Sequence, residues 1–174
     1  MANRPRKNPS PGRVLISEEK DAPSLNEMRA FAYRLLGRRE YSIFELGQRI
    51  GQKWPDAIDV DVLIDALVAE NLLSDERYVE SFVRFRLQRF QGPLKIKADL
   101  RSKGVSDFLV SRELEARSDE WSDLAALWLQ RQHPGVIDFD AKKKYYRRLT
   151  ARGFTHDQAM DALNPHIAPK RTED

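Results

Sequence analysis

Apolar side chains recur at helical spacing through most of the chain, between residues 24 and 165. Side chains three, four and seven positions apart lie on one face of an α-helix, whereas a half-buried strand alternates apolar and polar positions. Tyr78, Phe82 and Phe85 have the helical spacing, so we expect them to lie in a core rather than to stack on bases. Because no segment alternates convincingly, the pattern predicts an all-α fold.

Capping signals mark where the predicted helices begin. Ser24 with Glu27, and Ser42 with Glu45, have the spacing of a capping box, in which a hydroxyl and a carboxylate satisfy free backbone N–H groups. Proline follows Gly92 at a plausible first helical position, where its missing N–H is not needed. Further helix starts are expected at Ser74, Ser106 and Thr155.

The chain contains an internal repeat. Residues 92–114 resemble residues 141–163, because in both a basic helix ends at glycine, an apolar residue follows, and a short capped helix ends in leucine. At a constant offset of 49 positions, Gly104 matches Gly153. Each pair of helices is preceded by another helix, expected at 25–37, 75–90 and 119–132. This pattern predicts an elongated array of three tandem three-helix units that bury a continuous core between neighbours.

These units divide the chain into five segments. Prolines and basic residues without a sustained apolar pattern predict a disordered arm at the N-terminus, and two prolines predict a short tail at the C-terminus. The predicted segments are a basic arm at 1–23, three-helix units at 24–73, 74–117 and 118–165, and a tail at 166–174.

Composition narrows the class of protein. Of the 174 residues, 41% are hydrophobic, which is enough for a core, and 33% are charged, which predicts a heavily solvated surface. No apolar run approaches the roughly 20 residues of a membrane span, and the basic N-terminus lacks the apolar stretch of a secretory signal. The sequence has no cysteine, which excludes disulfides and suits a reducing compartment. We therefore expect a cytoplasmic protein that does not contact a membrane.

The net charge of +3 conceals a strong segregation of charge. Residues 1–13, 84–103 and 141–152 carry +4, +6 and +6, so the remainder carries −13. Between residues 56 and 80, eight acidic residues accompany a single basic one, Arg77. Basic runs often form solvated helix faces, but three runs with like charges at i,i+4 spacing favour a polyanion or an acidic partner that relieves their repulsion.

The sequence shows no chemistry typical of an enzyme. His133, His156 and His166 lack the spacing of metal ligands, and pairs of acidic residues stand at helix starts, where the helix dipole explains them. There is no glycine-rich phosphate loop and no nucleophile motif. Trp121 and Trp128, seven positions apart, are expected in a core. We therefore predict no catalytic residue, no metal and no cofactor.

The basic residues of the second and third units are the candidate contact residues. Lys97 and Arg101 are i,i+4 neighbours on one helix, whereas Lys95 can pair with Asp99 and is a weaker candidate. The full set of candidates for contact with DNA or an acidic partner is Arg84, Arg86, Arg89, Lys95, Lys97, Arg101, Lys103, Lys142, Lys143, Lys144, Arg147, Arg148 and Arg152.

Several short motifs between residues 25 and 165 point to a known family. They are Arg39-Glu-Tyr-Ser42, Leu73-Ser-Asp-Glu-Arg-Tyr78, Glu80-Ser-Phe-Val-Arg84, Gly92-Pro93, Asp99-Leu100, Lys103-Gly104 and Arg152-Gly-Phe154. Together they closely resemble the RecX family, the bacterial regulators of the RecA recombinase. The resemblance implies a curved, elongated array of three-helix repeats with no catalytic residue. Trp54-Pro55 departs from the glycine turn that the family usually has at this place.

The same resemblance implies a partner and a role. A RecX-like protein is expected to bind along the groove of the RecA–DNA filament and to inhibit filament growth, ATP hydrolysis and strand exchange. These reactions belong to homologous recombination, DNA repair and the SOS response. Direct binding to single- and double-stranded DNA is expected to be weaker, and we expect the protein to act as a monomer.

The residues also leave a second interpretation open, a stand-alone DNA-binding protein whose basic helices act like helix-turn-helix readers. Direct binding through about six phosphates predicts a slope near −5 for the logarithm of affinity against the logarithm of salt concentration, without a need for RecA. A filament regulator is expected to inhibit RecA far below the concentration at which it coats bare DNA.

Overall fold

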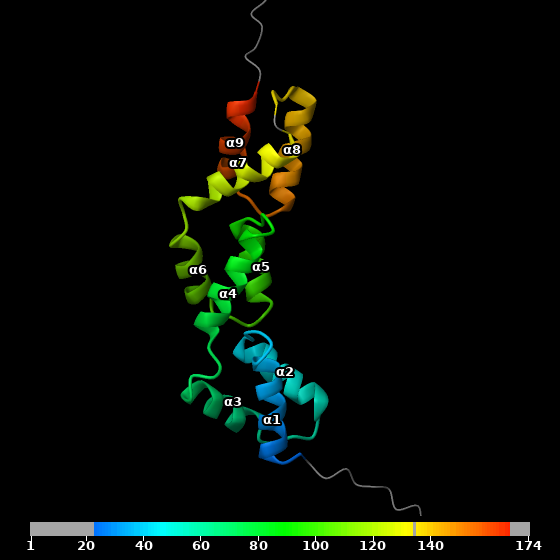
Figure 1. Ribbon diagram of the computed structural model, residues 1–174, viewed down its shortest axis with the longest axis vertical. Helices are drawn as coiled ribbons and strands as arrows, with labels where there is room; N and C mark the ends of the chain where they lie inside the picture. The colour runs from blue at the N-terminus through cyan, green and yellow to red at the C-terminus, as the bar shows by residue number, and fades with distance from the viewer. Residues whose placement is uncertain (1–22, 134, 168–174) are drawn as a thin grey trace, which may run out of the picture.

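A computed structural model shows an elongated stack of helices (Figure 1). The structure describes residues 23–133 and 135–167, and within them nine α-helices and one 3₁₀ turn follow one another without a strand. The prediction of an all-α array of three-helix repeats is confirmed. The predicted arm, apart from Pro23, and most of the predicted C-terminal tail lie outside the described residues.

The first unit consists of α1 (Leu25–Leu36), α2 (Ile43–Lys53) and α3 (Val60–Ala69). The capping box expected for α1 forms, because the Ser24 hydroxyl accepts from the Glu27 N–H and the Glu27 carboxylate accepts from the Ser24 N–H. Each helix turns its apolar stripe toward the other two. The buried residues between them are Met28, Ala32, Tyr41, Leu46, Ile50, Leu63, Ile64, Leu67 and Leu73.

The second unit consists of α4 (Asp75–Leu87), α5 (Pro93–Arg101) and α6 (Asp107–Glu115). Serine side chains cap α4 and α6 as expected, and proline begins α5. The buried residues are Tyr78, Val79, Val83, Ile96, Leu100, Val105, Val110, Leu114 and Trp121. Trp121 comes from the following helix, and its indole N–H donates to the carbonyl of Leu114 at 3.2 Å.

The third unit consists of α7 (Glu120–Gln132), α8 (Phe139–Ala151) and α9 (His156–Leu163), followed by the 3₁₀ turn Asn164–His166. The capping box expected at the start of α9 is present. An isolated bridge between Ile137 and Ile167 ties the chain beyond the last turn to the loop before α8. The buried residues are Ala125, Trp128, Leu129, Ile137, Tyr145, Leu149, Phe154, Ala159, Ala162 and Leu163.

Two glycines make the turns between the second and third helices of the second and third units. The φ angle is 71° at Gly104 and 90° at Gly153. In this left-handed region a side chain is strained, whereas glycine is not. The turn directs the N–H of the following apolar residue back to the carbonyl of the last leucine of the preceding helix. The repeat recognised in the sequence is therefore a repeat of this turn.

The expectation of one continuous core is wrong. Within the described residues the buried apolar side chains form three clusters, one for each unit. Leu124 packs against the second and the third cluster, but no apolar side chain is shared by the first and the second. There the contacts include two hydrogen bonds and the Phe44 side chain against Gly104: the Ser42 hydroxyl donates to the carbonyl of Lys103 at 2.7 Å, and Asp75 accepts from the Ile43 N–H at 2.9 Å. The helices of the first unit bury their apolar stripes within that unit, so little remains to join it to the second.

Phe85 also departs from expectation. Tyr78 is buried and Phe82 is partly buried, but the Phe85 side chain is 48% exposed. It lines a pocket between the first and second units instead of the core. The guanidinium of Arg89 lies over its ring, 4.1 Å from the ring centre. A spacing of seven positions therefore does not by itself guarantee burial.

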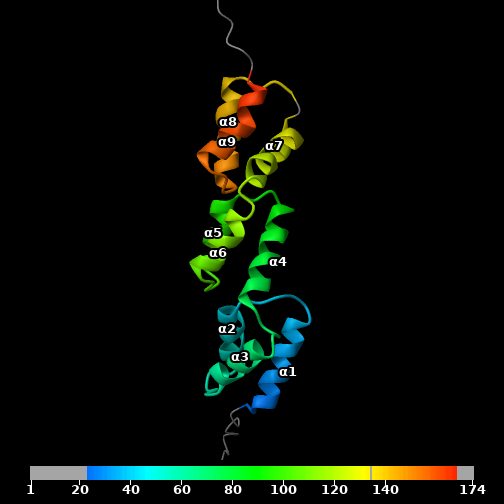
Figure 2. The ribbon, with the colours of Figure 1, turned by 90° about the vertical axis from the view of Figure 1, so that its left-hand side faces the viewer.

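The stacking of the units gives the molecule its shape. Viewed from two directions at right angles, the three units lie one beyond another along the long axis (Figure 2). The C-terminal end of α4 and the start of α5 reach the third unit, while the start of α4 faces the first. Each junction is therefore formed by helix ends and turns rather than by whole helix faces.

Candidate functional site

The basic residues of α4 have different surroundings. Arg84 is exposed and pairs with Glu80 one turn away at 2.7 Å. Arg86 lies in an internal network, where it pairs with Asp99 at 3.0 Å and donates to Gln91 at 2.9 Å. Its Nε atom is buried without a hydrogen-bond partner among the described residues. Arg86 therefore holds α4 against α5, although the sequence suggested it as a contact residue.

The basic residues of α5 are also largely engaged. Arg101 makes two hydrogen bonds to Asp107, at 2.6 and 2.8 Å, and these raise its pKa. Lys97 lies 3.3 Å from the Ser111 hydroxyl. The expected pairing of Lys95 with Asp99 does not form, because Asp99 pairs with Arg86, which approaches it from α4. Lys95 is left exposed at the start of the helix.

Lys103 lies at the junction of the first and second units. Its ammonium group is 3.4 Å from the Glu45 carboxylate, which also binds Arg39 at 3.0 Å. The capping box expected for α2 is therefore only half formed. The Ser42 hydroxyl accepts from the Glu45 N–H, but the Glu45 carboxylate turns to the two cations. Burial alone would raise the pKa of Glu45, but the hydrogen bond from Arg39 and the charges of Arg39 and Lys103 lower it below its usual 4.5.

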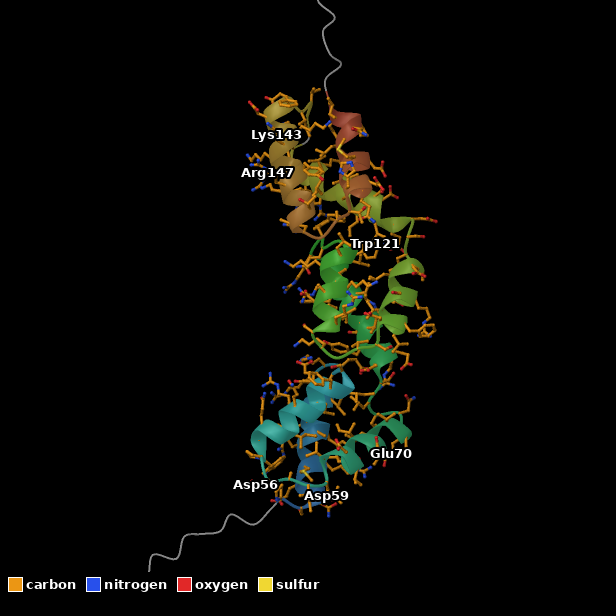
Figure 3. All side chains as sticks on the ribbon, turned by 180° about the vertical axis from the view of Figure 1, so that it is seen from behind. Asp56, Asp59, Glu70, Trp121, Lys143 and Arg147 are labelled. Atoms are coloured by element: carbon orange, nitrogen blue, oxygen red, sulfur yellow. The ribbon has the colours of Figure 1, made fainter. Side chains whose placement is uncertain are left out.

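α8 carries the densest exposed positive charge. Lys143, Lys144, Arg147 and Arg148 are exposed, and Lys142 is half-buried. Among the described residues, these cations pair with no carboxylate. In Figure 3, Lys143 and Arg147 project from the same side of the helix, as expected for residues four positions apart. The prediction that this helix presents an exposed basic arc agrees with their positions, while their contacts remain a prediction.

Arg152 ends α8 and faces the second unit. One of its guanidinium nitrogens donates to the carbonyls of Arg89 and Phe90, at 3.0 and 3.3 Å. The guanidinium also lies over the ring of Trp128, 4.7 Å from its centre. Burial and the nearby charge of Arg148 lower its pKa. Arg152 thus connects the third unit to the end of α4.

The structure brings three of the candidate residues together around one pocket. Lys95, Arg148 and Arg152 line a cavity of about 400 Å³ between the second and third units. Trp128 and Gln132, both from α7, complete much of its wall. The local sequence did not suggest Gln132, because α7 lies outside the basic runs. The other candidate residues lie elsewhere along the stack.

The acidic end of the molecule lies opposite the basic one. Asp56, Asp59 and Glu70 gather at the end formed by the first unit, while Lys143 and Arg147 lie near the other end (Figure 3). Glu70 is engaged there by Arg29 from α1. The segregation of charge along the sequence thus becomes a polarity along the long axis, which orients an approaching polyanion toward the third unit.

Comparison with known proteins supports the assignment suggested by the motifs. A family model described as the second three-helix domain of RecX matches residues 74–114. A regulatory protein RecX from Actinobacillus pleuropneumoniae serotype 5b is 37% identical over 123 residues, which cover 71% of this chain and 82% of the relative. The chain belongs to the RecX family. Another member, the regulatory protein RecX of Chromohalobacter salexigens, is 41% identical over 134 residues, 76% of this chain and 88% of the relative.

Solved RecX structures share the fold of this RecX-family chain. A RecX crystal structure from Lactobacillus salivarius matches with a TM-score of 0.69 at 20% identity, covering 81% of this chain and 95% of the other. A second crystal structure of regulatory protein RecX matches with a TM-score of 0.63 at 22% identity, covering 81% and 73%. The matched family model spans the second unit, so all the candidate cations from Arg84 to Lys103 fall inside it and those from Lys142 to Arg152 fall outside. In the described part of the chain, no helix has the length and apolar character to cross a membrane.

Proposed function

We propose that this chain binds the RecA–DNA filament and restrains RecA by inhibiting filament growth, ATP hydrolysis and strand exchange. Its membership of the RecX family, whose members compared above are named regulatory proteins, is the observation that carries the proposal. Such a role belongs to homologous recombination and DNA repair, including the SOS response, and it places the protein in the cytoplasm with its partner.

The geometry supports this role in two ways. The stack is elongated, so the second and third units can bridge adjacent RecA subunits as a monomer. The exposed cations of α8 have no carboxylate partner among the described residues, so they are available to DNA or to an acidic surface of the filament. Arg84, Arg101 and Lys103 have acidic partners, and they would have to exchange them on binding.

The first experiment reverses charge on α8. The double variant Lys143→Glu/Arg147→Glu is expected to need about tenfold more protein to inhibit the RecA ATPase, because two exposed cations facing the filament become anions. The measurement is ATP hydrolysis by RecA on single-stranded DNA as the protein is titrated. Both positions are exposed and lie outside the cores, so the fold is expected to persist.

The matched control makes the same change of charge on the first unit. Arg38→Glu/Arg49→Glu alters two exposed residues of the first unit and is expected to inhibit like the unaltered protein. Equal inhibition by both double variants would remove α8 from the contact surface. An unaltered protein that fails to inhibit RecA at any concentration would overturn the proposed function itself.

The exposed arc of α8 also favours a second candidate, direct binding to DNA as a stand-alone activity. In that case the affinity for bare DNA should fall with salt along a slope near −5 for about six phosphates. RecA inhibition should then appear only at concentrations that coat the DNA. Inhibition far below that concentration identifies the filament as the target.

A further inference from the structure

The pocket between the second and third units has a counterpart one repeat earlier. A cavity of about 380 Å³ lies between the first and second units and is lined by Glu45, Tyr78, Phe82 and Lys103. We call it the first junction pocket, and the cavity of about 400 Å³ lined by Lys95, Trp128, Gln132, Arg148 and Arg152 the second junction pocket. Each is enclosed by the start of one unit's second helix, the first helix of the next unit, and the turn that ends the next unit's second helix.

The two pockets are related residue by residue through the repeat. Fifty positions separate Glu45 from Lys95, Tyr78 from Trp128, and Phe82 from Gln132. The offset of 49 found in the turn relates Lys103 to Arg152. Both members of each pair line their respective pockets. The second junction pocket is therefore a copy of the first with different side chains.

The two pockets carry opposite charges at one equivalent position, which is Glu45 in the first and Lys95 in the second. In the first pocket the Glu45 carboxylate neutralises Arg39 at 3.0 Å and Lys103 at 3.4 Å. In the second pocket the equivalent position is Lys95, a cation.

The cations of the second junction pocket are consequently uncompensated. Among the described residues, Lys95, Arg148 and Arg152 pair with no carboxylate. Arg152 has a lowered pKa because it is buried and lies near Arg148, so its charged form is held at a cost. Only one of its guanidinium nitrogens is occupied by backbone carbonyls, and the remaining N–H groups can still donate.

The second junction pocket is held open by the backbone. The N–H of Gly92 donates to the carbonyl of Arg152 at 2.8 Å, and that of Leu94 to the carbonyl of Gly153 at 2.9 Å. A Cβ on Gly92 would lie 2.4 Å from backbone atoms of Gly153, so these two segments of the backbone are in direct contact. This contact fixes the backbone of Lys95 against the turn that follows Arg152 before any ligand arrives, which lowers the entropic cost of binding.

We propose that the second junction pocket binds a phosphate group of a nucleic-acid backbone, which takes the place that the Glu45 carboxylate fills in the first pocket. One carboxylate neutralises two cations in the first pocket, whereas three cations converge in the second. Arginine side chains form a fork that matches the oxygens of a phosphate, and lysine adds a point charge. The inference rests on the proposed function in that it names the ligand of part of the same surface.

The test restores the missing carboxylate. Lys95→Glu places an acid where the first pocket has one, and the full chain is titrated against fluorescein-labelled oligothymidylate without RecA. We expect affinity to fall about tenfold and the salt slope to become less steep by about 0.7, the contribution of one phosphate on a single strand. Arg49→Glu makes the same change in charge on α2 outside the pocket and is expected to weaken binding less.

A local readout identifies the ligand. The indole N–H resonance of Trp128, whose ring lies 4.7 Å from Arg152, is followed by NMR as oligothymidylate, inorganic phosphate or poly-glutamate is added. A shift with oligothymidylate that Lys95→Glu abolishes supports a backbone phosphate. A shift with inorganic phosphate alone means a free-phosphate site, and a larger shift with poly-glutamate means an acidic protein ligand; either result overturns the proposal.

Two further outcomes are decisive. Equal weakening by Lys95→Glu and Arg49→Glu would show a general effect of charge and overturn the pocket. If Lys95→Glu does not fold, Lys95→Gln removes the cation without adding an acid and is expected to weaken binding about threefold; unchanged binding then overturns the pocket. Because no arm contains RecA, the phosphate site can fail while inhibition of the RecA ATPase stands, and the reverse also holds.

Discussion

At the scale of the residue, whether a basic side chain is free for contact depends less on its position along its helix than on the acidic groups of neighbouring helices. Arg86 and Lys95 both belong to the basic run that the sequence marks as a contact surface. Arg86 pairs with Asp99 and donates to Gln91 within the second unit. Lys95 is exposed and lines a pocket with Arg148 and Arg152. The difference arises because Arg86, which approaches from α4, occupies the Asp99 carboxylate with which Lys95 was expected to pair.

The glycine turns provide a prediction at this scale. Gly153→Ala places a methyl group at a φ of 90° and brings its Cβ within 2.5 Å of the backbone nitrogen of Lys95. Strain in the left-handed region alone costs about 1–2 kcal/mol, and the contact adds to it. We expect the free energy of unfolding, measured with urea, to fall by about 2 kcal/mol or more.

Gly47→Ala is the matched control, because Gly47 lies within α2 and a Cβ there meets nothing within 4 Å. Alanine is a better helix former than glycine, so this variant is expected to gain up to about 1 kcal/mol. A stability loss of the same size in both variants would contradict the role assigned to the turn.

At the scale of the element, helix starts at the junctions are held by groups from the neighbouring unit. The N-terminus of α2 uses the Ser42 hydroxyl as its own cap, while Asp75 from α4 accepts from the Ile43 N–H at 2.9 Å. Glu45 in the first turn binds Lys103 of the second unit. The sequence indicated the local cap correctly but could not show the partners some 30 to 60 positions away, because they meet only when the units stack.

Glu45→Gln tests this polar junction. The folded protein lowers the pKa of Glu45, so the ionised carboxylate contributes stability above its usual pKa of 4.5, and that contribution is lost as the pH falls through the folded pKa. The variant is expected to be less stable than the unaltered protein at pH 7 by about 0.5–1 kcal/mol, a modest value because the cations are partly solvated. Urea unfolding across the pH range should show the two converging in acid.

Glu80→Gln is the comparison for that experiment. Glu80 pairs with Arg84 on the exposed face of one helix, where ion pairs contribute little, so we expect a change below about 0.5 kcal/mol. If the difference caused by Glu45→Gln stayed constant from neutral to acid pH, the ionised carboxylate would not be its source.

At the scale of the whole molecule, three cores joined by narrow junctions predict local rather than uniform stability. Leu149 is fully buried in the third cluster, and Leu149→Ala is expected to cost about 2–5 kcal/mol there. Stability in stacked repeats is a sum of unit and neighbour contributions. Amide hydrogen exchange should therefore accelerate in α8 and α9, with little change in α1 and α2.

Leu127→Ala is the control, because the Leu127 side chain is 44% exposed and belongs to none of the buried clusters. It should leave exchange almost unchanged. Equal acceleration in the first and third units on replacing Leu149 would mean that the stack unfolds as one cooperative body, and the separation of the cores would not limit cooperativity.

The sequence by itself determined the helices, their caps and the repeated glycine turn, because these depend on neighbours three to seven positions away. It also determined the segregation of charge and, through short motifs, the family. Only the tertiary structure decided that Arg86 pairs with Asp99, that Phe85 is exposed, and that Lys95, Arg148 and Arg152 share one pocket. The pocket joins residues more than 50 positions apart, and the Arg86–Asp99 pair joins two helices of one unit. Packing between elements, which no local pattern encodes, selects which of several possible partners each charge meets.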